Sequence, residues 1–275
     1  MGRYSLIALD MDGTLLNSEI KLSPGNREAI LRADRAGKQV VISTGRCLSE
    51  IRGTLKELPE IRYLVCENGS CVYDCKYGHT IHVDPIPTEE VKRILQLIRG
   101  ERVVVQAFNE NQSYFNRRDM DWLDACRVGV YRESFRTSAV FDEKLFRDFD
   151  ARPFRVEKIN LYCENAGDRA RLRAALSQRP LKLVDSFAYI LEAVSEHADK
   201  GRGLRMLCSH LGVPIEQTIA VGDSMNDIEI LAAAGFSAAM GNACPEAKAA
   251  AHVVAPDCDH DGVAWVIDNY LLGEN

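Results

Sequence analysis

Short apolar runs alternate with segments of helical period in the first third of the chain. Ser5–Leu9, Gln39–Ser43 and Tyr63–Cys66 have the length and composition of buried strands. Between the first two runs, apolar residues recur at helical spacing after the Ser-Pro pair at 23–24, which is typical of an N-cap followed by proline. This strand–helix–strand alternation predicts a parallel sheet with helices on its faces.

The last third of the chain resumes the same alternation. The run "TIAVGD", Thr218–Asp223, predicts a strand that ends in an acid. Helical and strand patterns then continue in shorter pieces, so this segment is expected to complete the sheet begun at the N-terminus. The further elements expected here are Gly203–Leu211, Ile228–Ala234, Phe236–Met240, Ala247–Ala251, His252–Val254 and Gly262–Leu272.

The middle of the chain has a different organisation. Asp84–Glu90 contains two prolines and is expected to link into a helix capped by Thr88. We therefore expect an α/β core in two pieces, residues 1–84 and 191–275, with an α+β domain inserted at 85–190. The elements expected in the insert are strands Val103–Phe108, Lys158–Cys163, Leu181–Val184 and Tyr189–Val194, and helices Glu143–Phe149 and Ala166–Leu176.

Composition narrows the class of protein. The chain has 275 residues, 46% hydrophobic and 27% charged, which is ordinary for a globular protein. Its net charge of −6 argues against a nucleic-acid partner, and no apolar run approaches the roughly 20 residues of a membrane helix. The nine cysteines are scattered and odd in number, so reduced thiols and a cytoplasmic location are expected.

Polar residues gather where the predicted strands end. In open α/β sheets, ligands bind outside the carboxyl ends of the strands, so parallel strands would bring these groups to one rim. The groups are Asp10 with Asp12, Thr44-Gly45-Arg46, Glu67-Asn68-Gly69, and Gly222-Asp223 with Asn226-Asp227.

Four of these residues are carboxylates: Asp10, Asp12, Asp223 and Asp227. Packed together without a cation they would repel one another, and some would bind a proton. A divalent ion removes this conflict, and an all-oxygen ligand set favours magnesium over zinc. The sequence therefore predicts a Mg²⁺ site at this rim.

The remaining polar groups suit a phosphate. Thr44 offers a hydroxyl, Gly13 allows a tight turn with outward N–H groups, and Lys200 brings a positive charge. A carboxylate beside a metal is a known nucleophile for phosphoryl transfer, and a second carboxylate two residues later can relay a proton. The residues thus point to phosphoryl-transfer chemistry.

Four motifs in order, "DMDGTL", "STGR", "DKG" and "GDSMND", resemble those of the haloacid dehalogenase-like superfamily. The longer forms "LDMDGTLLNS", "ENG" and "VGDSMNDIEIL" are similar to its Cof-type phosphatases of subclass IIB. This resemblance, which covers the whole chain, implies a Rossmann-like doubly wound parallel sheet with a large inserted α/β cap.

The resemblance also implies roles for single residues. Asp10 would be the nucleophile and a metal ligand. Asp12 would be the general acid and base, with its backbone carbonyl on the metal. Asp223 would bind the metal directly, with Asp227 in support.

Six further residues are expected to contact substrate. Arg46 and Asn68 are candidates for binding the substrate. The residues that the resemblance assigns to the phosphoryl group itself are Thr44, Gly45, Lys200 and Asn226.

The expected function is that of a magnesium-dependent phosphatase, acting on a small phosphorylated metabolite through an aspartyl-phosphate. A phosphomutase of the same superfamily and a non-catalytic metabolite-binding module are the alternatives. A dehalogenase would not need Asp12, and an ion-pumping ATPase would need membrane helices. Neither a nucleic acid nor a membrane is expected as a partner, and the chain is expected to be a monomer or homodimer.

Overall fold

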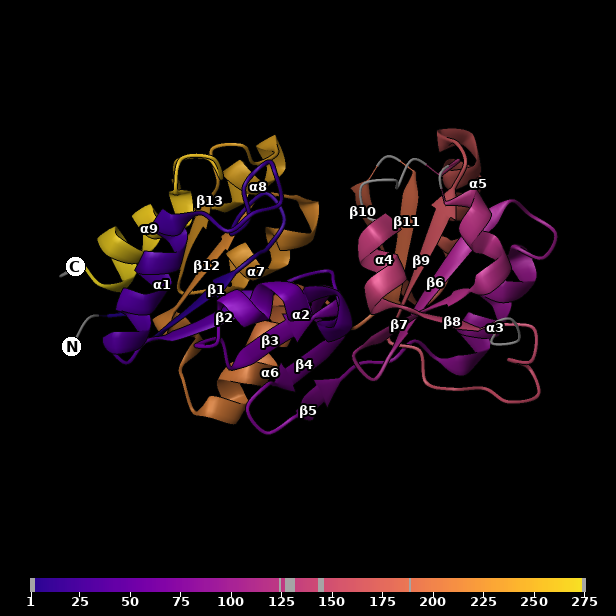
Figure 1. The fold of residues 1–275 in the computed structure, drawn as a ribbon, viewed down its shortest axis with the longest axis horizontal. Helices are drawn as coiled ribbons and strands as arrows, with labels where there is room; N and C mark the ends of the chain where they lie inside the picture. Colours follow the sequence, from indigo (N-terminus) through magenta and orange to yellow (C-terminus); the bar gives the residue numbers. More distant parts are fainter. Residues whose placement is uncertain (1–2, 124, 127–131, 143–145, 188, 274–275) are drawn as a thin grey trace. The chain divides into compact units, whose positions relative to one another are not determined.

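The computed structural model divides the chain into two compact units (Figure 1). The residues described are 3–123, 125–126, 132–142, 146–187 and 189–273. Unit 1 comprises Met1–Gly45, Gly53–Val83 and Asp199–Asn275. Unit 2 comprises Arg46–Arg52 and Asp84–Ala198.

Unit 1 is built on an eight-stranded sheet with the order β14-β13-β12-β1-β2-β3-β4-β5. The pairs from β14 to β3 are parallel, whereas β4 and β5 continue the sheet as an antiparallel hairpin. The strands are β1 (Leu6–Leu9), β2 (Gln39–Ser43), β3 (Tyr63–Cys66), β4 (Cys71–Asp74), β5 (His79–Val83), β12 (Thr218–Gly222), β13 (Phe236–Ala239) and β14 (Val253–Val254).

Helices of unit 1 form two packed groups, α1 with α9 and α6 with α7. The α-helices are α1 (Pro24–Arg35), α6 (Lys200–Leu211), α7 (Ile228–Ala233), α8 (Pro245–Ala250) and α9 (Gly262–Val266), and α2 (Leu48–Glu57) begins in unit 2 and ends in unit 1. Short helical turns are η1 (Glu67–Gly69), η4 (Ile215–Gln217), η5 (Met225–Asp227) and η6 (Ile267–Leu271).

The first helix illustrates why these segments fold locally. The Ser23 hydroxyl accepts the Asn26 N–H at 3.1 Å, and Pro24 occupies the first turn, where no intrahelical donor is needed. Ala29 and Ile30 are fully buried on one face of the helix. The predicted cap and the predicted apolar stripe are therefore both confirmed for α1.

The strand order reverses at β1. From β1 the chain moves to β2 and β3 on one side, whereas β12, β13 and β14 are added on the other side. Leu9 at the end of β1 lies beside both Ile42 and Val221 in the register. In doubly wound sheets such a reversal opens a crevice at the carboxyl ends of the strands, which is where ligands bind.

Unit 2 contains a six-stranded sheet with the order β10-β11-β9-β6-β7-β8. Its strands are β6 (Val103–Asn109), β7 (Gln112–Asn116), β8 (Val140–Asp142), β9 (Lys158–Cys163), β10 (Leu181–Phe187) and β11 (Ile190–Ser195). Its helices are α3 (Thr88–Leu97), α4 (Arg132–Ser138), α5 (Ala166–Leu176) and the 3-10 helix η2 (Arg117–Trp122). One face of the sheet, with Val105, Ile159 and Leu191, packs against apolar residues of α3 and α5.

Several elements differ from the sequence expectation. The strands β4, β5, β7 and β8 and the helices α2 and α4 were not predicted. Thr88 was expected to cap α3 but is its first residue, and the N-cap position is held by Pro87. Of the expected helix Glu143–Phe149, residues 143–145 lie outside the described residues and 146–149 form turns, with the Asp148 carbonyl accepting the Ala151 and Arg152 N–H groups. The expected core segment 191–275 begins inside β11, which pairs with β9 and β10 of unit 2.

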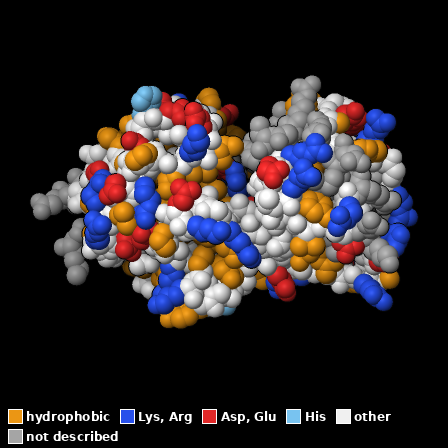
Figure 2. All heavy atoms as spheres, in the orientation of Figure 1, with side chains coloured by type: hydrophobic (Ala, Val, Ile, Leu, Met, Phe, Trp, Pro, Cys, Tyr) orange, Lys and Arg blue, Asp and Glu red, His pale blue; other side chains and the backbone are white. Residues whose placement is uncertain are grey.

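Charged side chains of both signs are interspersed over the face of the molecule drawn in Figure 2. Within the described part of the chain, no helix has the length and apolar character needed to cross a membrane. Each of the nine cysteines is among the described residues, and none of them forms a disulfide bond.

The β4–β5 hairpin depends on Asp74, whose side chain is 1% exposed and lies 2.7 Å from the Arg62 guanidinium. The hydrogen bond from Arg62 lowers the pKa of Asp74, assisted by the Tyr77 and Lys76 N–H groups. We expect Asp74→Asn to lower the free energy of unfolding by about 1–2 kcal/mol at neutral pH, a modest value because Arg62 is partly exposed.

This effect should depend on pH with a definite sign. Because the folded-state pKa of Asp74 is depressed, its contribution is present above its unfolded pKa of about 4 and is lost as the pH falls through the lower folded value. Thermal unfolding of both proteins at neutral pH and at about pH 3 measures this. An unchanged difference between them at the two pH values would contradict the assignment.

Candidate active site

Three of the predicted acids meet at the carboxyl ends of β1 and β12. Asp10 directly follows β1, Asp223 directly follows β12, and Asp227 ends η5. One carboxylate oxygen from each lies within 4.8 Å of those from the other two. Asp10 and Asp227 are buried, at 6% and 0% exposure, whereas Asp223 is partly exposed. The side chain of Asp12, also partly exposed, is not part of this cluster.

Lys200 connects two of these acids. It is the first residue of α6 and has 0% exposure. Its Nζ lies 2.6 Å from Oδ1 of Asp10 and 2.6 Å from Oδ1 of Asp227. Burial alone lowers the pKa of Lys200, but the two carboxylates outweigh burial and raise it, so the lysine stays charged.

Negative charge nevertheless exceeds positive charge in the cluster. Three carboxylates and one ammonium give a net charge of −2 when all are ionised. Burial, followed by repulsion from Asp227, raises the pKa of Asp10 well above its usual range, and the same two causes raise the pKa of Asp223 to about 6. A divalent cation among these oxygens would compensate the excess and favour the ionised forms.

The position of Asp227 is fixed by the turn that follows β12. Its Oδ2 accepts the N–H groups of Asp223 and Ser224, each at 3.0 Å. A Cβ on Gly222 would lie 2.5 Å from Cγ of Asp227, so the strand must end in glycine for this carboxylate to fold back. In the motif "GDSMND", the N–H groups at the start of the turn therefore fix the carboxylate of its last residue, Asp227.

Asp223 is held from the opposite segment by the turn after Asp10. Gly13 has φ +78°, and a Cβ there would lie 2.6 Å from Oδ2 of Asp223. The Thr14 hydroxyl donates to Oδ1 of Asp223 at 3.2 Å, and the Asn242 amide donates to the Gly13 carbonyl at 2.8 Å. Sequence reasoning missed Thr14 and Asn242, although the "DGT" run carries a signal for Thr14.

A second group of predicted residues gathers at the ends of β2 and β3. Thr44, 1% exposed, donates its N–H to the Val65 carbonyl at 2.8 Å and accepts the Asn68 N–H at 3.1 Å. Oδ1 of Asn68 accepts the Asn226 amide at 3.0 Å. Glu67 and Asn68 both have positive φ, 58° and 56°, which is costly for residues other than glycine. This turn thus places the side-chain amide of Asn68 within hydrogen-bonding distance of the Asn226 side chain.

Gly45 and Arg46 follow Thr44 directly and are half-buried. Gly45 closes the first segment of unit 1, and Arg46 opens the short segment that belongs to unit 2. The structure therefore places Thr44, Asn68 and Asn226 in one hydrogen-bonded group within unit 1, whereas it assigns Arg46 to the other compact unit.

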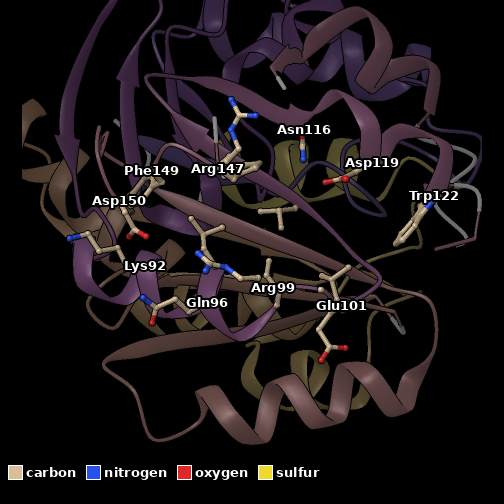
Figure 3. A pocket seen from close by; sticks show the side chains of 16 residues that line it. Lys92, Gln96, Arg99, Glu101, Asn116, Asp119, Trp122, Arg147, Phe149 and Asp150 are labelled. Carbon is tan, nitrogen blue, oxygen red and sulfur yellow. The ribbon is translucent and has the colours of Figure 1, made fainter. Parts of the chain in front are cut away.

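Unit 2 has a separate pocket of about 740 Å³ beside α3 and β6 (Figure 3). Lys92 and Arg99 line it together with Glu101 and Asp150, and apolar side chains that include Phe149 line the rest. Its charges are mixed, so it does not select an anion or a cation. None of the predicted site residues lines it.

Comparison with known proteins identifies the family. A family model described as haloacid dehalogenase-like hydrolase matches residues 7–267. The chain belongs to the haloacid dehalogenase-like hydrolase family. The resemblance carried by the four sequence motifs is thereby confirmed, and the chain is an enzyme of this hydrolase family with the predicted doubly wound α/β core.

Similar members of the family span the whole chain. Phosphatase YwpJ of Bacillus subtilis is 29% identical, over 97% of this chain and 99% of that protein. The 5-amino-6-(5-phospho-D-ribitylamino)uracil phosphatase YcsE of the same organism is 30% identical, over 97% and 96%. A solved haloacid dehalogenase-like hydrolase from B. subtilis superposes with a TM-score of 0.84 at 29% identity, covering 96% of this chain and 99% of the other.

The approach of η1 to the start of α6 sets the position of Lys200. Gly69 has φ +92°, and a Cβ there would lie 2.0 Å from the carbonyl oxygen of Asp199, the residue that caps α6. We expect Gly69→Ala to lower the free energy of unfolding by at least about 2 kcal/mol, because backbone must move. Thermal unfolding measures the change.

Gly53→Ala is the matched control. Gly53 lies inside α2, and a Cβ there would meet nothing within 4 Å. Replacing it should raise the free energy of unfolding by about 0.5–1 kcal/mol, because alanine is the better helix former. Equal effects of the two substitutions would contradict the packing argument.

Proposed function

We propose that the chain is a magnesium-dependent phosphatase that hydrolyses a small phosphorylated metabolite through an aspartyl-phosphate on Asp10. The observation that carries the proposal is the buried Lys200 ammonium between Asp10 and Asp227, beside the further acid Asp223. The names of the relatives YwpJ and YcsE, both phosphatases, support it.

The residues of the acidic cluster fit a magnesium ion. Oxygen ligands at a site with an excess of negative charge are what this cation requires. We assign the carboxylates of Asp10 and Asp223 and the backbone carbonyl of Asp12 as its ligands, with Asp227 in support through its hydrogen bonds. When bound, the ion would neutralise charge on the phosphoryl oxygens and orient them.

In the first half-reaction, Asp10 attacks phosphorus. A bond forms between its carboxylate oxygen and phosphorus while the bond from phosphorus to the ester oxygen breaks. Asp12 donates a proton to the departing oxygen, which leaves as an alcohol. Lys200 orients Asp10 and favours its ionised form, because its ammonium contacts Oδ1 directly.

In the second half-reaction, water attacks the aspartyl-phosphate. Asp12, now a carboxylate, removes a proton from the water as the new bond to phosphorus forms. The bond between phosphorus and the Asp10 oxygen breaks, which releases phosphate and regenerates the free carboxylate. Because the alcohol has already left, the net reaction is hydrolysis of a phosphate monoester.

The phosphoryl group needs hydrogen-bond donors around it. We assign the Thr44 hydroxyl, the Gly45 N–H and the Lys200 ammonium to this task. The Asn226 amide belongs with them because its bond to Asn68 holds it at the same rim. The inserted unit would act as a cap that excludes water from the first half-reaction and contacts the leaving group, Arg46 included.

Asp10→Asn should abolish turnover and leave the fold intact. The variant lacks the nucleophile, so we expect phosphate release from phenyl phosphate to fall at least about a thousandfold. The fold should tolerate the neutral amide, because burial already raises the pKa of Asp10. Rates are compared at equal fractions of folded protein, measured by thermal unfolding. Substantial residual activity would remove Asp10 as the nucleophile.

Removal of the metal should stop the reaction reversibly. Chelation is expected to abolish phosphate release and added Mg²⁺ to restore it. Mg²⁺ should also raise Tm, because it binds the folded cluster and not the unfolded chain. In Asp223→Asn, which lacks one proposed ligand, the Mg²⁺ concentration for half-maximal activity should rise at least about tenfold. Full activity in chelator would exclude the proposed mechanism.

A further inference from the structure

The residues after β1 form a turn that carries both acids of the proposed proton and phosphoryl transfers, Asp10 and Asp12. A hydrogen bond within the turn closes it, because the Leu15 N–H donates to the Asp10 carbonyl at 3.2 Å. In the middle of the turn lies Gly13, with φ +78°. Glycine has access to many backbone conformations, so contacts from outside the turn must select this one.

One such contact comes from the side chain of Asn242, which is 229 residues away in the chain. Its Nδ2 donates to the Gly13 carbonyl at 2.8 Å, and its Oδ1 accepts the Cys258 N–H at 2.9 Å. The amide group cannot turn over without losing both bonds, because one end of it only donates and the other only accepts. Asn242 therefore presents its NH₂ group to the turn in a fixed orientation.

The loop that carries Asn242 is attached to the segment that carries Asp223. The Cys244 N–H donates to the Asp223 carbonyl at 2.8 Å. A Cβ on Gly241 would lie 2.8 Å from the backbone nitrogen of Asp257, so the loop also packs closely against the segment that follows β14. The loop thus holds the end of β12 through its backbone and the turn after β1 through one side chain.

Gly13 lies between two residues of the turn whose positions affect the proposed chemistry. Asp12 precedes it and is the proposed proton donor and acceptor. Thr14 follows it, and its hydroxyl donates to Oδ1 of Asp223 at 3.2 Å. Proton transfer requires the acid to lie within hydrogen-bonding reach of the reacting oxygen, and a displacement of about 1 Å can cost about a hundredfold in rate.

We propose that Asn242 is a positioning residue for Asp12. By holding the Gly13 carbonyl, it keeps Asp12 where it can give a proton to the leaving group and later take one from the attacking water. The proposal rests on the proposed phosphatase function. In this role Asn242 acts through the backbone of the turn and not on the reacting atoms.

The leaving group of the ester reports on proton donation. 4-Nitrophenolate leaves as a stable anion, whereas the alkoxide formed from benzyl phosphate needs a proton, and each ester carries a single aromatic ring. In Asn242→Ala we expect kcat/KM for benzyl phosphate to fall at least about tenfold and that for 4-nitrophenyl phosphate to fall less than about twofold. Rates are measured at saturating Mg²⁺ and at equal fractions of folded protein.

Two further variants assign the effect to the donated hydrogen bond. Asn242→Asp keeps the size of the side chain and the acceptor for the Cys258 N–H, but it replaces the donor with an oxygen, so it should show the same selective loss. The matched control is Asn269→Ala. Asn269 is also exposed, and its amide donates to the Trp265 carbonyl at 2.8 Å, so the control loses a bond of the same kind elsewhere in unit 1. It should leave the ratio of the two kcat/KM values unchanged.

The second half-reaction gives an independent readout. Asp12 must take a proton from water whichever ester formed the aspartyl-phosphate. With 4-nitrophenyl phosphate, Asn242→Ala should therefore release a burst of about one 4-nitrophenolate per enzyme, followed by a kcat at least about tenfold below that of the unmodified enzyme. Loss of folded protein alone would lower kcat and kcat/KM equally.

The outcomes separate this proposal from the proposed function. Equal losses on the two esters would make Asn242 a structural residue and overturn the positioning role, and so would full activity of Asn242→Asp. In both cases the phosphatase function would stand. Release of no phosphate from either ester by the unmodified enzyme with Mg²⁺ would instead refute the phosphatase function, on which the role of Asn242 rests.

Discussion

The buried contact of Lys200 with Asp10 and Asp227 is the interaction on which the site depends. It joins the start of α6 to the ends of β1 and η5, three segments that are far apart in the chain. Without the ammonium, the acids could not remain ionised together in a buried position. The two glycines of α6 serve this contact, because a Cβ on Gly201 would lie 2.4 Å from the Glu229 carbonyl and one on Gly203 2.5 Å from Val65.

The acidic cluster was predictable because it follows from the order and direction of the strands in the sheet. Parallel strands present their carboxyl ends at one edge, so Asp10 and Asp223 had to converge once β1 and β12 were identified. Lys200 was predictable only through its motif, since a single lysine carries no periodicity. The left-handed conformation of Asn68 is one that asparagine tolerates better than most residues, whereas the same conformation at Glu67 is unfavourable and had no sequence signal.

Unit 2 was harder to predict for a physical reason. The neighbours on its sheet depend on the register of antiparallel strands, and the buried polar residues Gln106, Asn160 and Glu192 come together only through that register. The hairpin β4–β5 was missed because its strands do not alternate clearly between apolar and polar residues. The missed helix α4 has only Phe135 buried, so its sequence lacks an apolar stripe of helical period.

The two places where the chain passes between the units near the site have a mechanical consequence. One passage falls between Gly45 and Arg46, next to Thr44, and another between Ala198 and Asp199, next to Lys200. A phosphoryl group bound by Thr44 and Lys200 would fix the backbone next to both of these passages at the same time. A single small anion would then restrain the backbone at two points, so substrate would reduce the conformational freedom of the chain where it passes from one unit to the other.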